Sequence, residues 1–237
     1  IMSLLVCIGS IQARTQTTLD YQSRIHPEIA SNFMVVSQNE HATEVGYDIL
    51  RKGGNAVDAS VAVGFALAVT LPRAGNLGGG GFILIYHEES GDISAIDYRS
   101  AAPITATSDL FLEGESVVRF GHLVNAVPGS VAGLLKAHKD HGSLPLAELL
   151  KPAIRLARDG FEVTHDLNYA LEWAEESMLA NQVSRDKFYN AGEEPIQIRS
   201  IFKQPNLAKT LFKISKKGSD IFYKGEIAEW ISEESLS

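Results

Sequence analysis

The sequence predicts an α+β domain in which a small sheet is covered by helices. Two apolar, β-branched runs flank a turn and are typical of a hairpin, whereas segments on both sides of them carry apolar residues at helical spacing. The chain has 237 residues, of which 45% are hydrophobic, and it shows neither an internal repeat nor a Gly/Ser-rich linker. These features favour a single core that joins the helices to the sheet.

The first thirteen residues differ from the rest of the chain. The stretch "IMSLLVCIGSIQA", residues 1–13, is uncharged and ends in small and polar residues, which is typical of a secretory signal peptide that lacks its basic start. It is too short to span a bilayer, and an apolar N-terminal strand is the alternative. We therefore expect residues 1–13 to be a signal-peptide remnant, residues 14–33 an exposed arm, and residues 34–237 the domain. Loss of Cys7 with the leader fits a protein exported to a bacterial periplasm or secreted.

The domain is expected to begin with a strand, "MVVS", at Met34–Ser37. Asn39 can then cap a helix that ends at Gly53-Gly54. A second helix is predicted from Asn55, and because it is apolar nearly all round, it should be buried on most faces. Pro72 marks its end.

Four consecutive glycines, Gly78–Gly81, precede the hairpin strands predicted at Phe82–Tyr86 and Ile93–Asp97. A P-loop requires Lys and then Ser or Thr after its last glycine, and a dinucleotide site requires a strand before the glycines and a helix after them. Here a helix precedes the glycines and a strand follows, so we expect no helix N-terminus beside them to bind phosphate. We interpret the glycines as positions where another backbone approaches the start of a strand closely.

Helices dominate the second half of the sequence. Two are expected within "AVPGSVAGLLKAHKDHG" and "LAELLKPAIRLARDG", each closed by a glycine, with Ser130 as the cap of the first. Further helices are predicted at Leu167–Ala180, Asn206–Lys217 and Glu226–Ser232.

Several kinds of function are disfavoured. A formal net charge of −8 and the lack of a basic stripe argue against nucleic acid as a partner. "AVPGSVAG" is not a nucleophile elbow, because Pro128 stands where that motif needs glycine. His138 and His141 have no third ligand at a suitable spacing, so a solvated role near a helix end is favoured over a metal site. We expect neither a metal nor a cofactor.

The segment "AIDYRSAAP" is the most informative for chemistry. A strand delivers Asp97, Tyr98 and Arg99 into an Ala-Ala-Pro bend. An arginine at the end of a strand can present its rigid fork of N–H donors to a carboxylate. From residue chemistry alone, an ordinary surface arginine remains the alternative.

Five stretches of the sequence together resemble one family. "DILRKGGNAVDASVAVGFALAVTLP", "GNLGGGGF", "DYRSAAP", "NAVPGSVAGL" and "LLKPAIRLARDGF" occur in the order and spacing of the γ-glutamyltranspeptidases. From Met34 onward the chain is similar to the N-terminal, large-subunit region of that family. The resemblance implies an N-terminal-nucleophile (Ntn) hydrolase fold, a four-layer αββα sandwich that is incomplete in this chain.

The resemblance also implies a mechanism and a partner. In this family a precursor cleaves itself before a threonine, which becomes the N-terminus of a small subunit and attacks γ-glutamyl amides such as glutathione. The acyl group then passes to water, an amino acid or a peptide. By match to the D-x-R motif, Arg99 is expected to bind the donor's α-carboxylate. The catalytic threonine is expected downstream of Ser237, so the chain should hold no catalytic residue and be inactive without the small subunit.

Two alternatives stay open. A cephalosporin or glutaryl acylase, or a poly-γ-glutamate-processing enzyme, would have the same fold. The "DYR" sequence favours the transpeptidase, because the substrates of these relatives can lack a free α-amino acid head. A non-catalytic fragment, or a binding protein on the same scaffold, would lack a cleavage threonine downstream.

Overall fold

The computed structural model describes residues 29–104, 106–109, 125–190 and 194–236. The chain divides into two units, Ile1–Phe33 and Met34–Ser237. Only residues 29–33 of the first unit are described, and they form neither helix nor strand. The expected signal-peptide remnant and most of the expected arm therefore lie outside the described residues.

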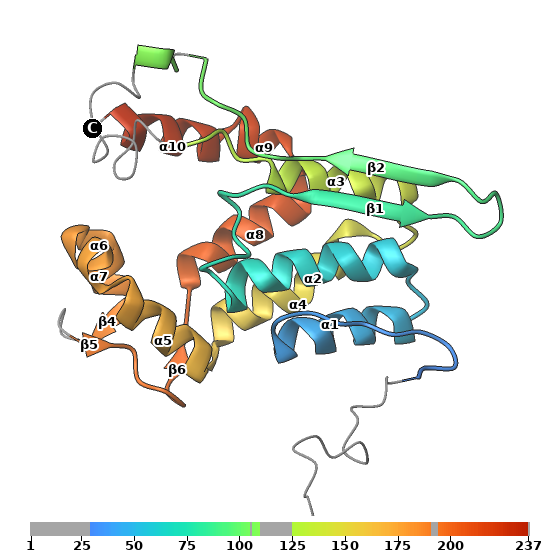
Figure 1. Ribbon diagram of the computed structural model, residues 1–237, viewed down its shortest axis with the longest axis horizontal. Helices are drawn as coiled ribbons and strands as arrows, with labels where there is room; N and C mark the ends of the chain where they lie inside the picture. The colour runs from blue at the N-terminus through green and yellow to red at the C-terminus, as the bar shows by residue number, and fades with distance from the viewer. Residues whose placement is uncertain (1–28, 105, 110–124, 191–193, 237) are drawn as a thin grey trace, which may run out of the picture. The chain divides into compact units, whose positions relative to one another are not determined.

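Helices form the body of the second unit (Figure 1). α2 (Ala56–Thr70) lies at its centre and packs against α1 (Glu40–Arg51), α3 (Ser130–His141) and α4 (Leu146–Asp159). α8 (Pro205–Lys217) packs in turn against α4. This unit is a helical layer that carries a small sheet, in agreement with the predicted α+β class.

The central helix, α2, is buried on most faces, as its apolar composition predicts. Val61 and Phe65 are fully buried within it. At its start, Asn55 and Asp58 form a capping box, in which each side chain accepts the other residue's backbone N–H. The helix ends two residues before Pro72, also as predicted.

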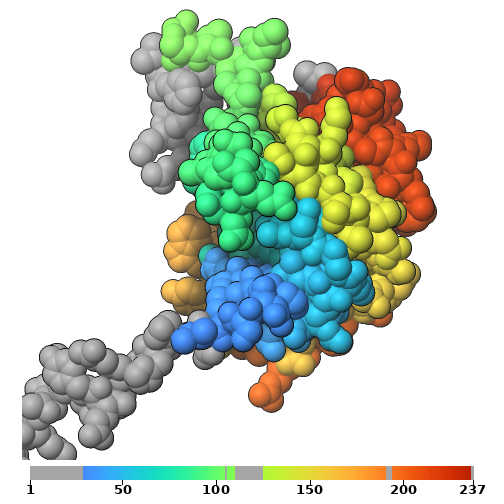
Figure 2. Space-filling model, turned by 90° about the vertical axis from the view of Figure 1, so that its right-hand side faces the viewer, coloured from blue at the N-terminus to red at the C-terminus, as the bar shows by residue number. Residues whose placement is uncertain are grey.

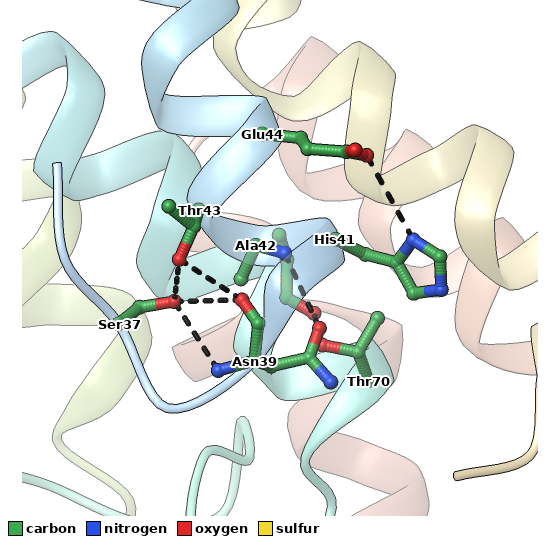
Figure 3. Close-up of polar contacts among 8 residues, drawn as sticks. Ser37, Asn39, His41, Ala42, Thr43, Glu44 and Thr70 are labelled. Atoms are coloured by element: carbon green, nitrogen blue, oxygen red, sulfur yellow. Dashed lines mark hydrogen bonds and ion pairs between the residues drawn. The ribbon is translucent and has the colours of Figure 1, made fainter.

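α1 begins at the predicted cap, Asn39 (Figure 3). The Asn39 side chain accepts the backbone N–H of Ala42 at 3.3 Å, and the Ser37 hydroxyl donates to the Asn39 carbonyl oxygen at 2.8 Å. The strand predicted at Met34–Ser37 is wrong. A strand needs a neighbour to pair its backbone groups, and the part of the chain that the structure describes offers none to this segment.

The predicted hairpin is confirmed. β1 (Phe82–Tyr86) and β2 (Ile93–Asp97) pair antiparallel. Ile83, Ile85 and Ile96 on one face pack into the core with the helices. The opposite face exposes four large apolar side chains, Phe82, Leu84, Tyr86 and Ile93. β1 is thus covered on only one side, although its apolar run suggests a fully buried strand.

The C-terminal part contains more helices and strands, and shorter ones, than the sequence predicts. The helix expected at Leu167–Ala180 is broken at Ala174 into α5 (His165–Trp173) and α6 (Glu175–Ala180). α10 (Glu226–Leu236) agrees with the sequence prediction. The structure adds α7 (Gln182–Phe188), α9 (Asp220–Tyr223) and two short antiparallel strand pairs, β3 (Phe161–Glu162) with β6 (Ile201–Phe202) and β4 (Tyr189–Asn190) with β5 (Glu194–Pro195). These elements are too short to show a repeated apolar spacing.

The glycines before β1 lie at a close contact between backbones. The strand ladder continues past both strands, because Gly81 and Tyr98 exchange backbone hydrogen bonds of 3.0 and 3.3 Å. A Cβ added to Gly80 would lie 2.5 Å from the Tyr98 carbonyl oxygen. A Cβ on Gly79 would lie 3.2 Å from the exposed, movable side chain of Asn76. The close approach predicted for the glycines is therefore most severe at Gly80.

Asp58 is a fully buried carboxylate that joins α2 to the loop before α4. Ser143 donates both its hydroxyl and its backbone N–H to this carboxylate, and the Leu144 N–H donates at 3.3 Å. Burial raises the pKa of Asp58, but these hydrogen bonds and the one from the Asn55 N–H outweigh burial and lower the pKa overall. The carboxylate thereby fastens α2 to a segment 85 residues further along the chain.

We predict that Asp58→Asn lowers the free energy of unfolding at neutral pH by about 2–3 kcal/mol, because charge-assisted hydrogen bonds are lost. The folded-state pKa of Asp58 lies below its unfolded value of about 3.9. Its stabilisation is therefore complete above that value and is lost as the pH falls through the folded pKa. The difference between wild type and variant, measured by urea unfolding, should shrink below about pH 4. A difference in unfolding free energy that stays the same at all pH values would contradict this prediction. Asp48→Asn, at an exposed aspartate, is the control.

We predict that Gly80→Ala destabilises the protein by about 1–3 kcal/mol, because the new methyl group must push two backbone segments apart. Gly79→Ala is the matched control, with an expected change within about 0.5 kcal/mol, because the Asn76 side chain can move away. Thermal unfolding of both variants measures the two effects. Equal melting temperatures for the two variants would rule out the backbone contact as the reason for glycine.

Candidate functional site

Arg99 follows the end of β2 by two residues, and its side chain is exposed. Successive side chains point to opposite faces of a strand, so Asp97 lies on the open face of the hairpin, whereas Tyr98 packs against the core. Among the residues that the structure describes, no hydrogen bond or ion pair involves the Arg99 guanidinium. Toward the described part of the chain, none of its five N–H donors therefore has a partner.

Asp97 fixes the backbone of Arg99 from the strand side. The Asp97 carboxylate accepts the backbone N–H of Arg99 at 2.9 Å, which is the two-residue hydrogen bond of an Asx turn. This bond turns the chain out of β2 and sets the direction in which Arg99 leaves it. The sequence signal for this role was the Asp two residues before Arg99, and we did not assign it from sequence.

Tyr98 fixes the same backbone from the core side. A Cβ on Gly133 of α3 would overlap the Tyr98 ring, and a Cβ on Gly81 would lie 2.8 Å from the Tyr98 hydroxyl. The ring thus occupies the space that these two glycines leave empty. Burial in this position raises the pKa of the Tyr98 phenol. Contacts of both Asp97 and Tyr98 therefore hold the backbone that leads into Arg99.

The N-terminus of α3 lies directly against the glycines. The Gly79 carbonyl oxygen accepts the backbone N–H groups of Gly129 and Ser130 at 2.8 and 3.0 Å. Gly129 is the N-cap residue of α3, and because it is a glycine it has no side chain to cap the helix. The expected cap at Ser130 is therefore wrong. The expectation that no helix N-terminus lies beside the glycines is also wrong. The Gly129 and Ser130 amides are nevertheless occupied by a carbonyl group of the chain and do not face a ligand.

The histidines of the last turn of α3 have separate partners. The His138 ring nitrogen Nε2 lies 2.7 Å from the Leu144 carbonyl oxygen. The His141 ring packs on His87 with their centroids 4.9 Å apart. Within the described ranges, no group of three or more His, Cys, Asp or Glu side chains could hold a metal ion.

A cavity of about 770 Å³ lies away from Arg99, between α5, α7 and the chain after α2. Its walls are mainly apolar, and an ion pair between Arg73 and Asp166, with a shortest distance of 2.8 Å, stands at its edge. Arg99 does not line it. Arg99 itself is exposed, just beyond the end of the hairpin.

The chain is similar to known proteins in sequence and in structure. The family model for gamma-glutamyltranspeptidase matches residues 42–236. The glutathione hydrolase proenzyme of Escherichia coli is 45% identical over 214 residues, covering 88% of this chain and 37% of that protein. The crystal structure of Helicobacter pylori gamma-glutamyltranspeptidase has a TM-score of 0.82 at 37% identity, covering 88% of this chain and 61% of that one. A cephalosporin acylase from Bacillus halodurans has a TM-score of 0.72 at 27% identity, covering 91% of this chain and 42% of that one.

These matches agree with the resemblance seen in the sequence. The chain spans 37% of the length of the Escherichia coli relative. The matched region, residues 42–236, contains the glycines, the hairpin, Arg99 and the helices that support it. The chain therefore belongs to the γ-glutamyltranspeptidase family, and its helical layer and hairpin are part of an Ntn-hydrolase fold.

Proposed function

We propose that this chain forms the donor-binding wall of an enzyme that cleaves γ-glutamyl amides such as glutathione. The enzyme transfers the γ-glutamyl group to water or to the amine of an amino acid or peptide. The observation that carries the proposal is the exposed guanidinium of Arg99, which stands on a fixed backbone in the D-x-R sequence of the family.

Arg99 acts by binding and orienting the donor. Two parallel N–H groups of a guanidinium match the two oxygens of a carboxylate, and this fixes the carboxylate in direction as well as in position. With its α-carboxylate held, the donor presents its γ-amide at a set distance from the nucleophile, which lowers the entropic part of the barrier. A lysine would supply the charge without the planar fork.

We assign the nucleophile to a threonine of the small subunit, downstream of Ser237. Its hydroxyl oxygen attacks the γ-amide carbon while its own α-amino group takes the proton. The C–N bond then breaks, and the departing amine receives that proton. Water or a second amine attacks the resulting ester, which releases glutamate or a new γ-glutamyl amide and restores the hydroxyl. On this account the chain is inactive without the small subunit.

The open face of the hairpin supports a partner subunit at this site. Its four large apolar side chains, of Phe82, Leu84, Tyr86 and Ile93, are between 64% and 77% exposed. Such a face is normally covered by a second sheet, which packs about 10 Å away. We place the sheet of the small subunit there. Because Arg99 follows the strand that borders this face, the donor would bind between the two subunits.

We further propose that the protein is exported, to the periplasm or the cell exterior of a bacterium. The support is the apolar, uncharged stretch at residues 1–13, which has the composition of a cleaved leader. None of the helices that the structure describes is both long and apolar enough to cross a membrane. No cofactor takes part in the proposed reaction.

An acylase is the second candidate, because the Bacillus halodurans cephalosporin acylase shares the fold. A poly-γ-glutamate-processing enzyme, which would have the same fold, is part of the same alternative. A glutaryl group keeps the carboxylate that Arg99 would bind and lacks only the α-amino group, so Arg99 alone does not separate the two. The transpeptidase is favoured by the higher identity to the Escherichia coli glutathione hydrolase proenzyme, 45% against 27% for the acylase. Comparing the rates of cleavage of γ-glutamyl and glutaryl anilides by the complete protein separates the two. Cleavage of neither anilide would favour a non-catalytic protein.

We predict that Arg99→Ala in the complete enzyme chiefly raises KM for γ-glutamyl donors, with a loss of about 2–4 kcal/mol in kcat/KM. The reason is that the donor carboxylate loses its bidentate partner. Arg99→Lys should lie between wild type and Arg99→Ala, because it keeps the charge and loses the fork. Initial rates over a range of γ-glutamyl anilide concentrations measure both variants.

Arg51→Ala is the control for this prediction. Arg51 is an exposed arginine in the last turn of α1, so its loss should leave KM unchanged. Unaltered kinetics in the Arg99→Ala variant would remove Arg99 from the donor site. A rise in KM for the Arg51→Ala variant would show that overall positive charge, and not the position of Arg99, attracts the donor.

A further inference from the structure

The N-terminus of α3 cannot be capped in the usual way. The first N–H groups of a helix lack intrahelical partners, and a Ser, Asp or Asn side chain at the N-cap position normally accepts one of them. The N-cap residue of α3 is Gly129, where any Cβ would overlap the Tyr98 carbonyl oxygen. The strand end that carries Arg99 therefore excludes a capping side chain at this position.

A residue distant in the sequence supplies the missing cap. The Tyr223 hydroxyl, from α9, accepts the backbone N–H of Ala132 at 3.0 Å and donates to the Pro128 carbonyl oxygen at 2.8 Å. Ala132 is the third residue of α3, which is a usual partner of an N-cap side chain. One hydroxyl group thus ties together the two sides of the turn that contains Gly129. The C-terminal residues, in red, lie beside α3 in the space-filling view (Figure 2).

This turn supports Arg99 through direct backbone contacts. The N–H of Gly129 donates to the Gly79 carbonyl oxygen, and the Gly129 backbone lies against the Tyr98 carbonyl group. The peptide bond from Tyr98 leads directly into Arg99. If the turn shifts, the Tyr98 backbone loses the surface on which it rests, and the direction of Arg99 changes with it.

We propose that Tyr223 is a positioning residue for the Arg99 site, acting through its cap on the N-terminus of α3. The proposal rests on the proposed function, because it assumes that Arg99 binds the donor. Tyr223 itself touches neither Arg99 nor, on this account, the substrate. Removing the Tyr223 hydroxyl should therefore weaken donor binding, as removing the Arg99 guanidinium does, but to a smaller extent.

The test is Tyr223→Phe in the complete enzyme, which removes only the hydroxyl group. We expect KM for a γ-glutamyl anilide to rise about three- to tenfold, with kcat changed by less than about twofold, because donor binding alone is weakened. Hydrogen exchange at the Ala132 amide should become faster, because its acceptor is gone. This exchange reports on the cap without any substrate.

Tyr189→Phe is the matched control. The Tyr189 hydroxyl also donates to a backbone carbonyl, that of Leu171 at 2.7 Å, but it lies in a part of the fold that does not contact Arg99. This variant should lose stability without a change in KM. An equal rise in KM for both variants would overturn the positioning role, since general loosening would then explain it.

Three other outcomes can be told apart. If Arg99→Ala raises KM but Tyr223→Phe does not, the positioning role of Tyr223 is wrong and the proposed function stands. If Arg99→Ala itself has no effect, the proposed function fails and the positioning role fails with it. Unchanged exchange at the Ala132 amide would show that the Tyr223 hydroxyl is not the cap.

Discussion

The position of Arg99 depends on a place where three backbone segments meet without side chains between them. The glycine segment before β1, the end of β2 and the first turn of α3 all approach one another at Tyr98. Glycine is needed at Gly80, Gly129 and Gly133 because a Cβ there would strike the backbone or the ring of Tyr98. The hydrogen bonds of Gly79 and Gly81 then hold the three segments together. The absence of side chains matters most, because the hydrogen bonds can form only when glycine lets the backbones come this close.

This junction explains how a hairpin that is covered on one face can still hold the backbone at Arg99 in place. The hairpin has only two strands, and one of its faces is uncovered, so its own pairing contributes little rigidity. Its firm end is the one nearest the junction, where the Gly81–Tyr98 pair extends the ladder onto the helical layer. Arg99 follows that pair immediately. The backbone at Arg99 is thus supported by α3 and the core, while the outer face of the hairpin is exposed.

The sequence predicted the parts of the fold that depend on local spacing. α1, α2 and the hairpin were found because their caps, apolar periods and turn residues are close together in the chain. The strand predicted at Met34–Ser37 was wrong because a β-branched run becomes a strand only where a partner strand exists. The presence of a partner is not a local property of the sequence. The short pairs β3–β6 and β4–β5 left too little pattern to detect.

For the site, the sequence indicated Arg99, through chemistry and family resemblance, but not its supports. Asp97 could have been assigned from its spacing to Arg99, because an Asx turn is local. The Tyr223 cap could not, since 91 residues separate it from Ala132. A serine before an apolar run is the usual signal of an N-cap, and it predicts Ser130 as the cap. The structure overrides that signal by placing the Arg99-bearing strand end against the turn.

The glycines also show what decides between a phosphate site and a structural contact. A run of glycines beside a helix N-terminus is the arrangement that binds phosphate, and the fold does bring α3 to Gly79. In a phosphate site the amides at the helix start point into open space. Here the amides of Gly129 and Ser130 point at the Gly79 carbonyl oxygen, and that of Ala132 at the Tyr223 hydroxyl. The positive end of the helix is used to hold the strand end that leads into Arg99, so the glycines serve a contact between backbones and not an anion site.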